Sequence, residues 1–208
     1  MELHSLLLFG VACLALNLIP GPDVIYIVSN TMKGKMLSGI KAAMGLGAGY
    51  FIHTLAASAG LSALIVSSAL AFSVVKWLGA AYLIYLGIQA LLSMYRGTTQ
   101  IAVEASGSQQ GNVFLQGVLV SVLNPKVALF FLSFLPQFID PATGSASVQL
   151  LMLGVVFCVL ATLCNLLYAS LGSWVFNRPN ARHYSRALEG VSGMLLIGLA
   201  SKIAFSER

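Results

Sequence analysis

Hydrophobic residues occur along this chain in long continuous runs, with the polar residues gathered between them. Six runs approach or exceed the ~20 residues that an α-helix needs to cross a bilayer. They lie at about 5–29, 42–66, 74–95, 113–135, 147–171 and 188–206. Because apolar positions do not alternate with polar ones, the runs predict helices and not strands. The sequence therefore predicts an all-α integral membrane protein with six transmembrane helices.

The composition agrees with this prediction. Of the 208 residues, 58% are hydrophobic and 8% are charged, which is too little charge for the surface of a soluble globule. The first run carries Glu2, has no basic segment before it and shows no small-residue cleavage site. We therefore expect it to be retained as a helix and not removed as a signal peptide.

The net charge of +5 comes from basic residues that gather beside the predicted helices. This distribution is typical of membrane orientation and not of nucleic-acid binding. Seven of these residues follow the first, third and fifth helices: Lys33, Lys35, Lys41, Arg96, Arg178, Arg182 and Arg186. Positive residues favour the cytoplasmic side, so both termini are predicted to lie on the outer side.

A polar stretch at 97–112 divides the single transmembrane domain, 1–208, into two halves of three helices, 1–96 and 113–208. Several spacings recur in both halves. The spacing of Gly10 and Asn17 recurs in Gly117 and Asn124, that of Pro20 and Gly49 in Pro125 and Gly154, and that of Gly79 and Gly87 in Gly190 and Gly198. Since three is an odd number, the second half would enter the membrane from the opposite side. The sequence thus predicts two inverted three-helix repeats, as in many secondary transporters.

Prolines stand inside two of the predicted helices. Pro20, Gly21 and Pro22 lie within the first, and Pro125 lies at the matching place in the fourth. A proline inside a helix removes a backbone hydrogen bond and clashes with the preceding turn, so helices 1 and 4 are predicted to be broken. Such breaks persist in a membrane where they face protein or a water-filled cavity. Their free carbonyl and amide groups suit a substrate with both charges, such as an amino acid.

Charged and amide side chains lie beside the breaks. Asp23 and Lys126 follow the prolines, and a charge at the bilayer centre costs ~2.5 to 3.5 kcal/mol, so we expect both to face protein. Asp23 suits an ammonium group or a proton, and Lys126 suits a carboxylate. The alternatives are an ion pair between the two residues, or extension of Lys126 to the membrane interface. Three asparagines, Asn17, Asn124 and Asn165, are candidate ligands of the substrate. Alternatively, their side chains form hydrogen bonds that join one helix to another.

His53, deep in the second helix, is a candidate for proton coupling, with packing as the alternative. A metal site finds less support, because hard cations need several oxygen ligands and Asp23 is the one acid expected at mid-depth. Cys158 and Cys164 are too far apart to share a helix face. Enzyme and ATP-site motifs are absent from the sequence, so no enzymatic activity and no cofactor are expected, and an ion gradient must drive transport.

Four segments of the chain resemble the amino-acid exporter family of the lysine exporters and the homoserine/threonine resistance proteins. They are PGPD at 20–23, GIKAAMGLGAG at 39–49, LGAAYLIYLGIQAL at 78–91 and NPKVALFFLSFLPQF at 124–138. The resemblance implies a small multi-pass carrier of a bacterial inner membrane that expels amino acids or close derivatives by proton antiport; with the orientation predicted from the basic residues, both termini would be periplasmic. The matched motif positions are Pro20, Gly21, Pro22, Asn124, Pro125 and Lys126.

The expected substrate is a neutral amino acid or a derivative, such as homoserine, threonine, leucine or homoserine lactone. A doubly cationic substrate such as lysine would need a second carboxylate near the site. The expected partners are the amino acid, protons and the lipid bilayer, without nucleic acid, and the Gly/Ala-rich faces also suit a homodimer. A metal or other cation transporter is the alternative function.

Overall fold

The computed structural model describes residues 3–61, 69–96, 111–140, 144–176 and 181–204, and within these ranges the chain is helical and contains no strand. The helices are α1 (Leu3–Leu18), α2 (Pro22–Ala56), α4 (Ala69–Arg96), α5 (Val113–Val122), α6 (Pro125–Leu129), α7 (Ala146–Phe176) and α8 (Ala181–Ala204). Short π- and 3-10-helical segments are η1 (Ala57–Leu61), η2 (Phe130–Phe134) and η3 (Leu135–Phe138). The prediction of an all-α fold is confirmed.

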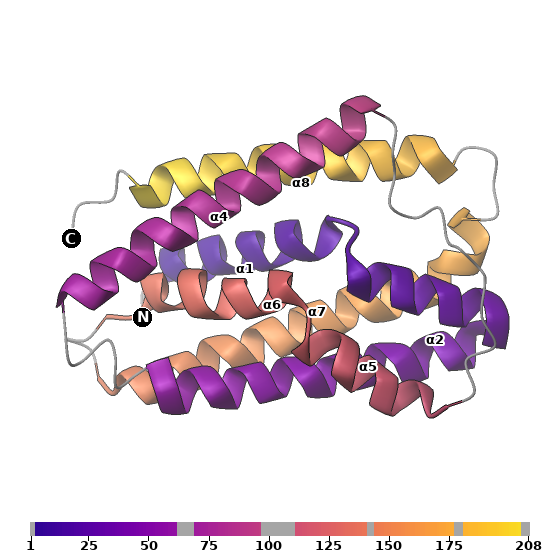
Figure 1. Cartoon of the computed structure of the whole chain (residues 1–208), viewed down its shortest axis with the longest axis horizontal. Coiled ribbons are helices and arrows are strands. Elements are labelled where there is room, and N and C mark those ends of the chain that lie inside the picture. Colours follow the sequence, from indigo (N-terminus) through magenta and orange to yellow (C-terminus); the bar gives the residue numbers. More distant parts are fainter. Residues whose placement is uncertain (1–2, 62–68, 97–110, 141–143, 177–180, 205–208) are drawn as a thin grey trace.

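The helices run back and forth along the long axis of the molecule (Figure 1). α1 begins and α8 ends at the same end. Among the residues that the structure describes, one helix is long and apolar enough to cross a membrane by itself, over Ala146–Leu171. Two bent pairs, Ser5–Leu18 with Pro22–Gly60 and Val113–Val122 with Pro125–Phe138, raise this to three spans if each pair counts as one. The arrangement with six spans stays a prediction.

Both predicted helix breaks are present. The chain bends by 55° across residues 19–21, between α1 and α2, and by 47° across residues 123–124, between α5 and α6. Pro22 and Pro125 each occupy the first position of the helix that follows the break. The first amides of a helix have no intrahelical acceptor, so the missing N–H of proline costs nothing there. The prolines therefore start new half-helices.

The connection between the first two predicted helices differs from the prediction. The sequence predicts that one helix ends near residue 29 and the next begins near 42, but α2 continues through this segment and reverses direction at Gly34 and Lys35. Lys35 takes a φ of 62°, in the left-handed region that few residues other than glycine adopt. Residues such as Lys and Met favour helix, so helical structure extends to within a residue of the reversal.

Close backbone approach joins α2 to α5. A methyl group added at Gly45 would overlap the backbone carbonyl of Phe114, and one added at Gly117 would lie 2.9 Å from the carbonyl oxygen of Ala42. Small residues allow helices in membranes to approach in this way. α2 also packs along α7, while α4 packs mainly against α8.

An aromatic cluster holds the second break against the rest of the molecule. The ring of Phe9 in α1 is fully buried, 5.2 Å from the ring of Phe138 and 6.2 Å from that of Phe130. Phe130 lies 4.9 Å from Phe157 of α7. Offset and edge contacts of this kind stabilise aromatic pairs beyond their buried area. The segments that follow α6 are thereby fixed to α1 and α7.

Substitution of Gly45 by alanine is expected to lower the midpoint of thermal unfolding in detergent. The added methyl would overlap the backbone of α5, which cannot move aside as a flexible side chain would, and overpacking costs about 1–3 kcal/mol. Gly10→Ala is the matched control, because nothing lies within 4 Å of the added methyl. An unchanged midpoint for Gly45→Ala would contradict the close approach of α2 and α5.

Candidate functional site

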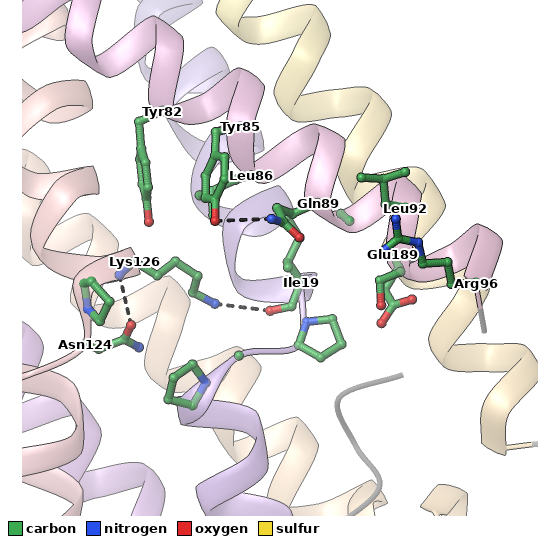
Figure 2. Close-up of a pocket in the computed structure, with 16 residues that line it drawn as sticks. Ile19, Tyr82, Tyr85, Leu86, Gln89, Leu92, Arg96, Asn124, Lys126 and Glu189 are labelled. Atoms are coloured by element: carbon green, nitrogen blue, oxygen red, sulfur yellow. Dashed lines mark hydrogen bonds between the residues drawn. The ribbon is translucent and has the colours of Figure 1, made fainter. Parts of the chain in front are cut away.

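A cavity of about 660 Å³ lies where the two helix breaks face α4 and α8 (Figure 2). Its lining comprises Ile19, Pro20, Gly21 and Pro22 from the first break, Asn124, Pro125 and Lys126 from the second, Tyr82, Tyr85, Leu86, Gln89, Ala90, Leu92, Ser93 and Arg96 from α4, and Glu189 from α8. The volume is in the range of small-molecule binding sites. Both half-chains thus contribute to one cavity.

Lys126 extends from the second break to the first. Its Nζ donates hydrogen bonds to the carbonyl oxygens of Ile19, at 3.1 Å, and Leu16, at 3.3 Å (Figure 2 shows the bond to Ile19). The last carbonyls of a helix lack intrahelical donors, and the helix dipole favours a positive charge beside them. Tyr168 of α7 donates a further hydrogen bond, 3.3 Å long, to the carbonyl oxygen of Leu18. Side chains from the second half of the chain therefore cap the end of α1.

Asp23 lies on the other side of the first break, in the first turn of α2. The helix dipole favours a negative charge at this position. The side chain is 2% exposed, and it accepts hydrogen bonds from the Asn124 amide and, at 2.9 Å, from the Tyr50 hydroxyl. Asn165 of α7 in turn donates to the Tyr50 hydroxyl at 3.0 Å. Each carboxylate oxygen of Asp23 thus has a donor, one from a distant part of α2 and one from the second break.

Asn124 joins the two breaks directly. Its Oδ1 accepts a hydrogen bond from the backbone N–H of Lys126 at 3.0 Å and caps the start of α6. Asparagine is among the residues preferred at this capping position. Because the same side chain donates to Asp23 through its Nδ2, the start of α6 is fixed to the start of α2.

His53 has a similar position at the second break. Its Nε2 lies 3.2 Å from the carbonyl oxygen of Ser121, near the end of α5. A carbonyl oxygen only accepts, so this ring nitrogen carries a hydrogen. The imidazole stacks on Phe131 with ring centroids 5.6 Å apart. A side chain from the first half of the chain therefore binds the end of α5, as Lys126 binds the end of α1.

The predicted site residues fall into two groups. The matched motif positions, Pro20, Gly21, Pro22, Asn124, Pro125 and Lys126, line the cavity. Asp23, Asn165, His53 and Asn17 are not among its lining residues. Asn17 donates instead to the carbonyl oxygen of Cys13 in its own helix, at 2.7 Å. Asp23 and Lys126 hydrogen bond to separate partners and not to each other, so these contacts give no support to the alternative of an ion pair between them.

Sequence reasoning missed the wall that α4 and α8 contribute. Glu189 is 2% exposed and lines the cavity, although its place near the start of the last predicted helix pointed to the membrane interface. An acid inside an apolar run is the signal that would have identified it. Within the described parts of the chain, no group of three or more His, Cys, Asp or Glu side chains is placed to hold a metal ion.

Comparison with known proteins gives a family and several relatives. A family model described as LysE type translocator matches residues 14–207. An uncharacterised membrane protein of Bacillus subtilis is 29% identical, over 98% of this chain and all of its own length. Leucine efflux proteins of Salmonella choleraesuis and Salmonella paratyphi A are each 29% identical, over 93% of this chain and 92% of their own. No solved structure matches the chain significantly.

Substitution of Lys126 by methionine is expected to lower the thermal midpoint in detergent, because the carbonyls of Leu16 and Ile19 lose their donor. A buried polar group without a partner costs about 1–3 kcal/mol. Lys41→Met, at an exposed lysine, is the matched control and should leave the midpoint unchanged. Combined with Asp23→Asn, the double variant is expected to be less stable than either single variant, whereas rescue in the double variant would indicate an ion pair.

Proposed function

The chain belongs to the family of LysE type translocators, and on this basis we propose that it is a secondary transporter that exports amino acids or close derivatives across the cytoplasmic membrane. One observation carries the proposal: two broken helices meet at a cavity of small-molecule size, with Lys126 in its wall. Broken helices that point their ends at a central substrate are typical of secondary transporters. The leucine efflux proteins among its relatives support a neutral amino acid as the substrate.

Lys126 is the proposed ligand of the substrate carboxylate. An ammonium group has three hydrogens to donate, and two of those on Lys126 bind the carbonyl oxygens of Leu16 and Ile19. These bonds hold the side chain in one orientation at the cavity wall, so little side-chain entropy remains to be lost on binding. The third hydrogen is left for a carboxylate, and bonds between two charged groups are the strong ones. Pro20, Gly21, Pro22 and Pro125 shape the wall around it.

The proposed architecture is a single domain of six membrane spans in two inverted repeats, 1–96 and 113–208, joined by the linker at 97–112. In such a repeat, α7 is the counterpart of α2 and α8 is the counterpart of α4. The helix contacts support this, because each of these helices packs extensively against its own counterpart. Gly87 and Gly193 meet at the contact of α4 with α8, where a methyl on either would lie 2.9 Å from the carbonyl oxygen of the other. Equivalent residues of two repeats meet where the symmetry axis passes, which favours Gly193 over Gly198 as the counterpart of Gly87.

The proposed orientation places both termini in the periplasm of a bacterial inner membrane. α1 begins and α8 ends at one end of the molecule, while the reversal of α2 and the end of α4 lie at the other (Figure 1). The second end carries Lys33, Lys35 and Arg96, and positive residues favour the cytoplasm. A phosphatase reporter fused to the C-terminus, which is active only outside the cytoplasm, is therefore expected to be active. Activity of a cytoplasmic reporter at this position would contradict the orientation.

Asp23 is the proposed site of proton coupling. Its charge strengthens the hydrogen bonds from Asn124 and Tyr50 that hold the first break to the second and to the adjacent part of α2. A protonated carboxyl accepts more weakly and carries a donor of its own, so protonation would loosen the contact between the half-helices. Proton binding is in this way linked to rearrangement of the cavity. His53 and Asn165, which bind other parts of the same assembly, are proposed to support this step.

Uptake of labelled leucine into inverted vesicles tests both parts of this proposal. An imposed gradient, acid inside, is expected to accelerate uptake by the wild-type protein, because outward proton flow drives the antiport. Asp23→Asn is expected to transport at a rate that no longer responds to the gradient. Asp140→Asn, at a carboxylate two residues after η3 and outside the cavity lining, is the matched control.

Two results would contradict the proposal. Absence of transport of leucine, threonine and homoserine by the wild-type protein would exclude the substrate class. A normal gradient response in well-folded Asp23→Asn would exclude Asp23 as the coupling residue.

A further inference from the structure

Glu189 has an oxygen without a partner inside the cavity wall. The side chain belongs to α8, is 2% exposed and lines the cavity. Ser93 of α4 hydrogen bonds to the carboxylate of Glu189, but the Oε2 of Glu189 has no hydrogen-bond partner among the residues that the structure describes. A buried carboxylate is costly unless donors surround it. Such an oxygen is expected where a ligand supplies the missing donor.

The position of Glu189 relative to Lys126 indicates the kind of donor. Figure 2 shows the two side chains on opposite sides of the cavity, with Ile19 between them. Hydrogen bonds to the carbonyl oxygens at the end of α1 fix the Lys126 ammonium group on one side of the cavity. A negative group on one side of a cavity and a positive group on the other match a molecule that carries an ammonium and a carboxylate.

The wall between the charges is contributed by α4. Tyr85 and Gln89 hydrogen bond to each other at 3.2 Å, and Tyr82 stacks on Tyr85 with ring centroids 6.2 Å apart. These aromatic and amide groups carry no charge. They suit the uncharged side chain of a substrate whose two charged groups are bound elsewhere.

We propose that Glu189 binds the ammonium group of the substrate through Oε2, while Lys126 binds the carboxylate. This assignment rests on the proposed export of amino acids and adds to it the second half of the binding site. It also replaces the role that the sequence indicated for Asp23. Both oxygens of Asp23 already have donors, and Asp23 is not part of the cavity lining.

Arginine side chains near Glu189 offer a competing role for it. Arg96 lines the same cavity, and Arg186 lies one helical turn before Glu189; both are exposed. A carboxylate that only neutralised these cations would stabilise the fold without distinguishing one ligand from another. A ligand site would distinguish molecules with an ammonium group from those without one, and the two roles are separable on this ground.

Three related ligands separate the contributions of the charges. Leucine carries both groups, 4-methylpentanoate lacks the ammonium and 3-methylbutylamine lacks the carboxylate. The measurement is the dissociation constant of each for the purified full-length protein in detergent. The wild-type protein is expected to bind leucine about 10- to 100-fold more tightly than 4-methylpentanoate, as hydrogen bonds between charged groups imply.

Glu189→Gln is expected to abolish this preference while leaving the affinity for 4-methylpentanoate unchanged. Asp140→Asn, the control carboxylate outside the cavity, should keep the preference. A folded Glu189→Gln protein that still prefers leucine over 4-methylpentanoate would overturn the role of Glu189 and leave the proposed transport function intact. Failure of the wild-type protein to bind any amino acid would overturn both.

A second measurement on the unmodified protein covers the case in which Glu189→Gln does not fold. Dicyclohexylcarbodiimide reacts with carboxyl groups in apolar surroundings, and mass spectrometry of the α8 peptide reports modification of Glu189. Leucine and 3-methylbutylamine are expected to protect Glu189, whereas 4-methylpentanoate should not. Equal modification with and without leucine would overturn the proposal.

Discussion

The fold depends on hydrogen bonds that close two interrupted helices. An interruption in a membrane frees carbonyl and amide groups that lipid cannot satisfy. In this chain the donors come from the opposite half: Lys126 binds the last carbonyls of α1, and His53 binds a carbonyl at the end of α5. Each break is therefore hydrogen-bonded by a side chain from the other half. The breaks thus join the halves in addition to opening the cavity.

The chemistry of the cavity follows from this exchange of side chains. Because Lys126 must reach the end of α1, its positive charge is held in the wall next to Gly21. Asp23 lies outside the cavity lining, and its carboxylate accepts hydrogen bonds from Tyr50 and Asn124 instead of facing the cavity. The opposite charge inside the cavity comes instead from Glu189 on α8. The two carboxylates, Asp23 and Glu189, therefore have different roles, and the hydrogen-bond partners of each carboxylate determine its role.

Much of this arrangement could be predicted from the sequence, because prolines act on the local backbone. Pro22 and Pro125 locate both breaks, and the apolar runs locate the helices. The partners of Lys126 could not be predicted, since they depend on the angles at the breaks, 55° and 47°. Glu189 was missed because distance along the sequence from a helix end does not reveal which face the residue occupies. The reversal at Lys35 lies within the predicted connection at 29–42, but its tightness was missed, because propensity does not indicate how far the two helices extend toward the turn.

The contact of α4 with α8 has a mechanical consequence. These two helices pack mainly on each other, through Gly87 and Gly193, while α2 packs on α5 and α7. The cavity lies between the two assemblies, and its charges are divided between them, with Glu189 on one and Lys126 at the other. A zwitterion bound as proposed, to both charges, would draw the two assemblies together by electrostatic attraction. In this proposal, loading of the cavity would favour the approach of the two assemblies, and an uncharged molecule of the same shape would not.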